Sequence, residues 1–205
     1  MILDLINTIM PRYSYKCLFF GDLFVLDRYC SGREYVVELG CNMGTTTRLL
    51  SGLAKKVITV DVFDMFDNVE LDAQKECCRN NHLENKNSAA AIRESLSDCK
   101  NVDVIQATTR AASTGFAPLS IDTLFVDADH HFEGVYRDYI DYFDKVKVDG
   151  YLLFHDTVHC DNPGVNRLYT EILQKDARLK EEIYSFSFEG VILFSSISVF
   201  KKESQ

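Results

Sequence analysis

The segment VVELGCNMGTTTRLL, residues 36–50, is the clearest indication of the fold of this chain. It reads as a β-branched strand, a turn that contains Gly40 and Gly44, and the threonine-rich start of a helix. Such a turn brings backbone N–H groups and the N-terminus of a helix close to a ligand. Because many strand-to-helix turns contain glycine, the turn alone leaves open whether a ligand binds there.

Short β-rich runs alternate with helical patterns over most of the chain. The runs are apolar on both faces, which predicts a parallel sheet covered by helices on each side. They occupy residues 35–39, 57–62, 102–107, 123–127 and 151–154. Apolar spacing and turn residues predict helices over residues 69–80, 88–97, 132–146 and 163–178. We expect Asp149-Gly150 to end the third of these helices before the next strand.

The C-terminal residues break this alternation. Two β-rich runs lie within residues 182–202, and Glu189-Gly190 is the turn between them. No helix fits between the runs, so they should pair antiparallel as a hairpin at the edge of the sheet. The chain is therefore expected to form one α/β domain of five strand–helix units closed by a hairpin.

Length, charge and cysteine content exclude several classes of protein. The 205 residues suit one domain, and a formal charge of −9 without a basic cluster argues against nucleic acid as a partner. The chain has no long apolar run and no signal-peptide pattern at its start, so we expect no membrane association. Seven cysteines without CxxC spacing predict neither a disulfide framework nor a zinc site, which favours the cytoplasm.

Three positions indicate which nucleotide the glycine turn binds. Asn42 stands at the second glycine of the GxGxxG pattern of dinucleotide-binding proteins, and it tolerates left-handed backbone angles while adding a side chain. Glu38 places a negative charge where a pyrophosphate would be repelled. Asp61 ends the second strand, where a carboxylate can accept both hydroxyls of a ribose. A ribose, a cationic group and no diphosphate describe S-adenosylmethionine better than NAD.

A second group of polar residues follows two neighbouring predicted strands. TLFVDADHHFEG (residues 123–134) places Asp127 after one strand, and LLFHDTVHCDN (residues 152–162) places His155 and Asp156 after the next. Because ligands of open α/β sheets bind at the carboxyl ends of the strands, these three side chains should converge. Carboxylates and an imidazole suit a divalent ion such as Mg²⁺ or Mn²⁺.

A structural interpretation of the same segments stays open. Asp129 or His130 could cap the helix that begins near residue 132, because an acid after a strand often accepts from the first helical turn. His155 could be a hydrogen-bonded core residue, and His131 could simply be solvated. The functional interpretation therefore depends on the two strand-end acids occurring together rather than on any single histidine.

The order ELGCNMG … VDVF … FVDAD … GYLLFHDT, with a terminal hairpin, resembles class I S-adenosylmethionine-dependent methyltransferases over roughly residues 30–202. The resemblance implies a Rossmann-like fold with a seven-stranded, mostly parallel sheet of order 3-2-1-4-5-7-6. It places the methionine end of the cofactor at the glycine turn, the ribose at Asp61 and the adenine near Thr108. The implied cofactor-binding residues are Glu38, Gly40, Asn42, Gly44, Thr45, Asp61, Thr108 and Asp127.

Within that class, FVDAD resembles the motif of the metal-dependent caffeoyl-CoA and catechol O-methyltransferases. The resemblance implies that Asp127 is a metal ligand, together with His155 and Asp156, where those enzymes have Asp-Asn. The branch that methylates antibiotic sugars carries Asp-x-x-His or Asp-x-Asp at the first site, and this chain has both patterns. By that likeness His130 is the first choice of general base and Asp129 the second.

These patterns predict an O-methyltransferase that uses S-adenosylmethionine and Mg²⁺ or Mn²⁺ to methylate a small-molecule hydroxyl. A sugar or glycoside is favoured as the acceptor by the Asp-x-x-His pattern and the absence of tryptophan. An NAD-dependent oxidoreductase and a catalytically silent S-adenosylmethionine-binding protein are the alternatives. Residues 1–31 are expected to form a helical extension that covers the acceptor, contacts a second subunit of a homodimer, or simply packs as a helix on the sheet. Residues 32–205 would form the methyltransferase domain.

Overall fold

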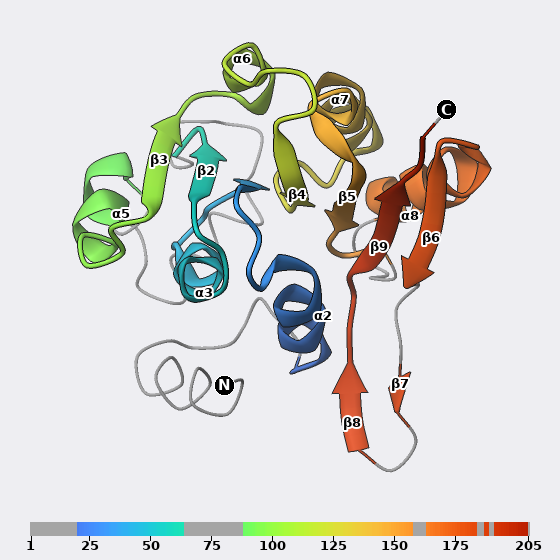
Figure 1. The fold of residues 1–205 in the computed structure, drawn as a ribbon, viewed down its shortest axis with the longest axis horizontal. Coiled ribbons are helices and arrows are strands. Elements are labelled where there is room, and N and C mark those ends of the chain that lie inside the picture. The colour runs from blue at the N-terminus through green and yellow to red at the C-terminus, as the bar shows by residue number, and fades with distance from the viewer. Residues whose placement is uncertain (1–19, 64–87, 158–162, 184–186, 189–190, 205) are drawn as a thin grey trace.

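A seven-stranded sheet forms the centre of the molecule in the computed structural model, which describes residues 20–63, 88–157, 163–183, 187–188 and 191–204 (Figure 1). Its order is β3-β2-β1-β4-β5-β9-β6. The parallel strands are β1 (Val36–Leu39), β2 (Val57–Asp61), β3 (Val102–Gln106), β4 (Ile121–Val126) and β5 (Val146–Phe154). Antiparallel strands β9 (Ser198–Lys202) and β6 (Leu179–Ile183) complete one edge. The predicted order 3-2-1-4-5-7-6 and its antiparallel edge are confirmed.

The strand order reverses between β1 and β4, which pair in parallel although they are not consecutive along the chain. At such a switch point the loops after the two strands leave in opposite directions, which opens a crevice at their carboxyl ends. The glycine turn follows β1 and Asp127 follows β4. The fold therefore brings both predicted chemical segments to one end of the sheet.

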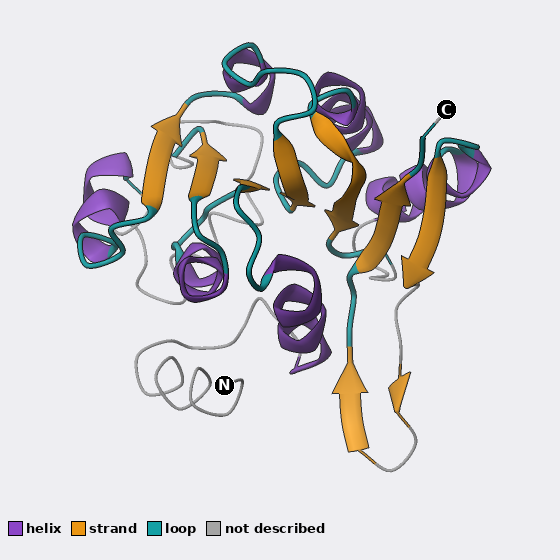
Figure 2. Ribbon diagram, viewed as in Figure 1, coloured by secondary structure: helices purple, strands orange, loops and turns teal. Residues whose placement is uncertain are grey.

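Helices cover both faces of the sheet (Figure 2). Alternate strand residues point to opposite faces, so β1 contributes Val36 to one core and Val37 to the other. The first core contains residues of α2 (Phe20–Cys30) and α3 (Thr45–Leu53). The second contains residues of α7 (Phe132–Phe143) and α8 (Pro163–Glu171). Shorter helices α5 (Ala89–Ser95), α6 (Thr109–Ser113) and η1 (Leu173–Lys175) complete the described set.

Two predicted boundaries are wrong. Helix α7 ends at Phe143 and β5 already begins at Val146, so Asp149-Gly150 lies inside the strand instead of ending the helix. Asp149 has a φ of 64°, and a Cβ on Gly150 would lie 2.9 Å from the carbonyl oxygen of Asp122. This dipeptide therefore forms an irregularity in β5 that packs closely on β4. Helix α8 ends at Glu171 and not near residue 178.

The C-terminal hairpin is longer than predicted, and each of its two arms is interrupted. Each β-rich run splits in two, so that β7 (Ser187–Phe188) and β8 (Val191–Phe194) pair antiparallel in a separate two-stranded sheet. This small sheet extends away from the main one in Figure 1. The predicted helix at 69–80 and the turn at 189–190 lie outside the described residues. Among the helices that the structure describes, none is long and apolar enough to cross a membrane.

Candidate active site

The glycine turn folds tightly against the end of β4. Gly40, Asn42 and Gly44 have φ values of 92°, 47° and 74°, so the left-handed conformation expected for Asn42 is present. A Cβ on Gly40 would lie 2.1 Å from the carbonyl oxygen of Asp127. Only glycine allows this approach, because any side chain would collide with backbone. The turn and the first predicted metal ligand are thus in contact.

Asp61 holds the turn from the end of β2. Its Oδ2 accepts from the backbone N–H groups of Cys41 at 2.9 Å and Asn42 at 2.8 Å, and its Oδ1 accepts from Phe63 N–H at 2.8 Å. A carboxylate has about four lone-pair positions, so these three bonds leave it capacity for a further donor. The predicted ribose acid therefore lies beside the turn and also shapes it.

Glu38 lies completely buried beneath the turn. Its Oε2 accepts from the hydroxyl of Thr47 in α3 at 2.5 Å, while its Oε1 has no hydrogen-bond partner among the described residues. Burial raises the pKa of Glu38 to about 8, against the hydrogen bonds from Thr47 and Thr59. A buried carboxyl oxygen without a partner fits a ligand that brings a positive group, as S-adenosylmethionine does.

The remaining predicted cofactor residues are helix-terminal. Thr45 is the first residue of α3, directly after the turn. Thr108 precedes α6 at the end of β3, and its hydroxyl accepts from Ala111 N–H at 3.2 Å as an N-cap. Both therefore follow the carboxyl ends of strands, at the same end of the sheet as the glycine turn.

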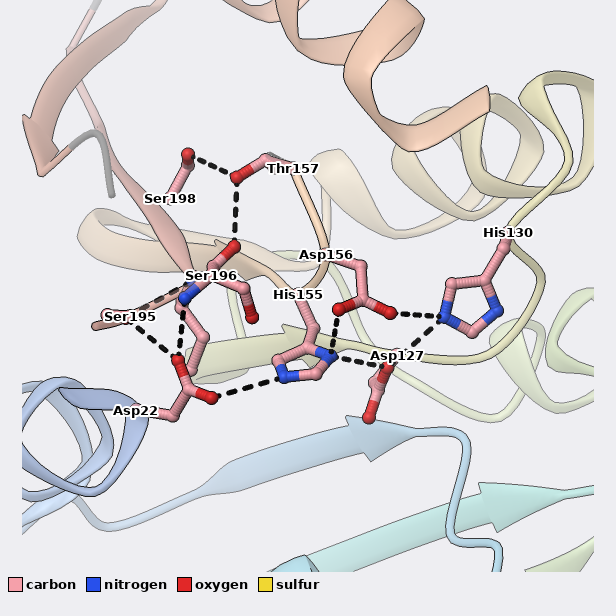
Figure 3. Close-up of polar contacts among 10 residues, drawn as sticks. Asp22, Asp127, His130, His155, Asp156, Thr157, Ser195, Ser196 and Ser198 are labelled. Atoms are coloured by element: carbon pink, nitrogen blue, oxygen red, sulfur yellow. Dashed lines mark hydrogen bonds and ion pairs between the residues drawn. The ribbon is translucent and has the colours of Figure 1, made fainter. Parts of the chain in front are cut away.

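Four side chains from the segments that follow β4 and β5 meet in one cluster (Figure 3). Nε2 of His130 lies 3.1 Å from Oδ2 of Asp156 and 3.6 Å from Oδ1 of Asp127. Nδ1 of His155 lies 3.1 Å from Oδ1 of Asp127 and 3.3 Å from Oδ1 of Asp156. The two carboxylates thus lie between two imidazoles, and the predicted convergence of Asp127, His155 and Asp156 is present.

The two histidines approach the carboxylates from different environments. The side chain of His155 is 5% exposed, whereas that of His130 is 25% exposed. Asp127, His130 and Asp156 each offer a ligand atom within 4.8 Å of the others, which is close enough for one metal ion. His130 thus shares the two carboxylates with the predicted ligand His155, and it is the more accessible of the two histidines.

Charges in the cluster are strongly coupled. Burial opposes a proton on His130, but hydrogen bonds and charge from Asp127 and Asp156 outweigh it and raise the pKa of His130 to about 9. Burial likewise opposes ionisation of the two acids, yet the imidazoles lower the pKa of each carboxyl below its usual value. The pKa of His155 is raised well above its usual value, because Asp127 and its other acidic neighbours overcome the effect of burial. Without a metal, protons on the histidines balance the carboxylates.

Asp129 and His131 lie outside this cluster. Oδ1 of Asp129 accepts from the backbone N–H of His131 and lies 2.9 Å from its ring Nδ1. A Cβ on Gly134 would collide with the Asp129 carboxylate, which therefore lies over the first turn of α7. The structure brings His130, and not Asp129, to the strand-end acids. His159, the second histidine of the segment at residues 152–162, is outside the described residues.

Sequence reasoning missed the residue behind His155. Asp22 of α2 is fully buried, and its Oδ2 lies 3.4 Å from Nε2 of His155, 133 positions away along the chain. Its Oδ1 accepts from Ser195 Oγ and from the backbone N–H of Ser196, each at 2.9 Å. An acid in an apolar helix such as FGDLFVL was the available signal, but nothing local to it indicates a partner.

A family model described as a methyltransferase domain matches residues 37–157 of the chain. The chain therefore belongs to this methyltransferase family, and its fold and cofactor turn are those of a class I S-adenosylmethionine-dependent methyltransferase. No curated protein matches the sequence.

Solved structures of similar fold are numerous and distant in sequence. An rRNA methylase from Streptococcus thermophilus is 15% identical with a TM-score of 0.59, over 89% of this chain and 95% of that one. A protein from Streptococcus mutans described as a methyltransferase, solved with S-adenosylhomocysteine, is 14% identical with a TM-score of 0.58, over 89% and 94%. An S-adenosylmethionine-dependent O-methyltransferase from Thermotoga maritima is 12% identical with a TM-score of 0.61, over 98% and 72%. At these identities the likeness shows the fold alone.

Proposed function

We propose that this protein transfers a methyl group from S-adenosylmethionine to a hydroxyl of a small molecule, with a sugar or glycoside as the favoured acceptor and a divalent metal ion as an aid. The observation that carries the proposal is the cluster of Asp127, Asp156 and two histidines beside the cofactor turn. A divalent ion held by two carboxylates would assist transfer to a hydroxyl, which is otherwise a poor nucleophile near neutral pH.

The donor set fits Mg²⁺ or Mn²⁺. Asp127 and Asp156 are carboxylates with lowered pKa values, and hard divalent ions prefer oxygen ligands. His155 offers Nδ1 from the buried side, where this atom has no hydrogen-bond partner among the described residues. A bound divalent ion would supply Lewis acidity, which lowers the pKa of coordinated water and acts similarly on an alcohol.

His130 is proposed as the general base. It lies on the more exposed side of the carboxylates, where an acceptor hydroxyl would enter, and its Nε2 is held 3.1 Å from Asp156. A histidine in hydrogen-bond reach of the acceptor can take the hydroxyl proton as the methyl group is transferred. Asp129 is the weaker candidate, because its carboxylate is engaged by His131.

The alternatives are less well supported. An NAD-dependent oxidoreductase would have to place a pyrophosphate over the left-handed Asn42 and the buried carboxyl of Glu38. A silent S-adenosylmethionine-binding protein would not require the strand-end acids. A nucleic-acid acceptor would meet a chain of net charge −9.

Thermal shift and a transfer assay test the proposal together. We expect S-adenosylhomocysteine to raise the melting temperature, NAD⁺ to leave it unchanged, and Mn²⁺ to raise it unless a chelator is present. Methyl transfer to a panel of sugars, glycosides and catechols should require metal and should fall at least about 100-fold in Asp127→Ala and Asp156→Ala. His131→Ala, an exposed histidine beside the cluster, is the control and should keep its rate.

Each part of the proposal can fail separately. Stabilisation by NAD⁺ but not by S-adenosylhomocysteine would support the oxidoreductase. Cofactor binding without any metal response, unchanged in Asp127→Ala, would support the silent binding protein. Full transfer by His130→Ala together with loss in Asp129→Ala would reverse the assignment of the base.

A further inference from the structure

Asp22 is an unusual residue for the helix that carries it. Helix α2 packs on the sheet through Leu23 and Leu26, and Asp22 lies in its first turn with no exposed surface. A fully buried carboxylate loses its hydration and therefore requires donors or a basic partner. Two donors come from the segment before β9, namely Ser195 Oγ and Ser196 N–H.

The second oxygen of this carboxylate faces the candidate active site. Oδ2 of Asp22 lies 3.4 Å from Nε2 of His155, whose ring stands at the end of β5 (Figure 3). The other ring nitrogen, Nδ1, points at the carboxylates of Asp127 and Asp156 at 3.1 and 3.3 Å. His155 thus bridges the N-terminal helix and the two strand-end acids.

Nδ1 of His155 is buried and lies against the two carboxylates as an ion pair, without a hydrogen-bond partner among the described residues. In metal proteins a ligating histidine usually donates its second ring N–H to a carboxylate, which sets the ring orientation and leaves the other nitrogen for the ion. Asp22, His155 and the two acids have this arrangement.

We propose that Asp22 is a positioning residue for the metal site: its carboxylate fixes the ring of His155 so that Nδ1 faces Asp127 and Asp156. Asp22 has no exposed surface and would act only through His155. This inference rests on the proposed function, which supplies the metal ion. It adds that α2, which lies in the segment expected to be an extension, is a structural part of the metal site.

Asp22→Asn is the direct test, because it keeps the shape and the oxygen that Ser195 and Ser196 bind while replacing the oxygen that faces His155. We expect the Kd for Mn²⁺, measured by electron paramagnetic resonance on the whole protein, to rise about 10- to 100-fold. The Kd for S-adenosylhomocysteine should stay unchanged. Ser195→Ala is the matched control, since it removes a bond to the same carboxylate but leaves the contact with His155. It should lower the melting temperature and change the Kd for Mn²⁺ by less than about threefold.

A double-mutant cycle separates positioning from a general loss of stability. In a His155→Gln background, Asp22→Asn should change the Kd for Mn²⁺ by less than about twofold, because the residue through which it acts is gone. Additive effects in the two variants would overturn the proposal. The proposal would also be overturned if Asp22→Asn had the same Kd for Mn²⁺ as the unsubstituted protein while Asp127→Asn abolished binding. That result would leave the proposed function intact. If the unsubstituted protein binds no Mn²⁺, the metal in the proposed function fails, and the role of Asp22 fails with it.

Nuclear magnetic resonance of the unsubstituted protein gives a second test that does not depend on folding of the Asp22 variant. The ¹⁵N signals of His155, assigned by their loss in His155→Gln, should show a proton on Nε2, and Zn²⁺ should shift Nδ1. If Zn²⁺ shifted the signal of Nε2 instead, the ring would not be held as proposed. The same conclusion would follow if Zn²⁺ shifted neither nitrogen while Asp127→Asn abolished Zn²⁺ binding.

Discussion

Replacing Glu38 with glutamine should make the cofactor-free protein more stable near pH 7, and the gain should depend on pH. The side chain of Glu38 is fully buried, and burial raises its pKa from 4.5 to about 8. The folded protein therefore keeps a proton that the unfolded chain releases above about pH 4.5. Because a raised acid pKa favours the protonated folded state, stability falls as the pH rises from about 4.5 to about 8.

The size of the effect follows from the difference between the two pKa values. Each pH unit in this window costs about 1.4 kcal/mol, so the carboxyl destabilises the fold by about 3 kcal/mol at pH 7 and about 1 kcal/mol at pH 5. Glutamine does not titrate, but its amide adds a donor where Oε1 has no partner, which costs about 1 kcal/mol. The net gain of Glu38→Gln is about 2 kcal/mol at pH 7 and close to zero at pH 5. In a domain of this size, 2 kcal/mol raises the melting temperature by about 4 to 8 °C.

Urea unfolding of both proteins without cofactor, followed by circular dichroism at several pH values between 5 and 8, measures this difference. Glu133→Gln in α7 is the matched control, because it makes the same charge change on an exposed side chain. It should shift stability by less than about 0.5 kcal/mol at every pH. If Glu38→Gln and the unsubstituted protein gave parallel curves over this range, Glu38 would be ionised in the fold and the reasoning would be refuted.

Three further substitutions test other parts of the structure. Asp138 is buried in α7, and burial raises its pKa to about 7, so Asp138→Asn should gain about 2 kcal/mol near pH 7 and lose that gain toward pH 4 in urea unfolding. Gly40→Ala should cost more than about 3 kcal/mol in thermal unfolding, because its Cβ would collide with a backbone carbonyl at a φ of 92°. Lys202 is buried and donates to the carbonyl oxygens of Phe143 and Val146, so Lys202→Met should cost about 2 to 4 kcal/mol in urea unfolding.

Each of the three has an outcome that would contradict it. A gain in Asp138→Asn that did not vary with pH would show that the acid is not protonated in the fold. Gly32 also has a positive φ, of 73°, but an added Cβ there meets nothing within 4 Å. Gly32→Ala should therefore cost only about 1 kcal/mol, and an equal loss in Gly40→Ala would exclude the collision. Unchanged stability of Lys202→Met would mean that water reaches the two carbonyl groups.

The glycine turn and the sheet could be predicted because their signals are local. The run at 36–39 is apolar except for Glu38, and β1 is buried along its whole length. Asn42 was expected to accept a left-handed conformation, and its φ is 47°. The boundaries of α7 and β5 were less predictable, since Asp149-Gly150 has the composition of a helix end and yet forms an irregularity within a strand. Turn residues favour a break in regular structure, and tertiary packing decides which element contains it.

The candidate site divides in the same way. Asp127 and Asp156 directly follow two neighbouring strands, so the sequence alone predicts that two acids meet at the carboxyl ends of a parallel sheet. Which of His130 and Asp129 lies beside these acids could not be predicted, because both follow the same strand. The His130 side chain turns toward Asp156, whereas that of Asp129 turns toward α7.

Only the tertiary structure could decide that Asp22 belongs to this site. Its contact with His155 joins positions 133 residues apart, and no spacing or periodicity relates a helix before the first strand to the end of the fifth. Patterns in sequence report on neighbours within a few residues, because those contacts follow from the backbone geometry of one element. Contacts between elements depend on how the whole chain packs. That packing brings the buried Asp22 of α2 against His155 and gives it its proposed role.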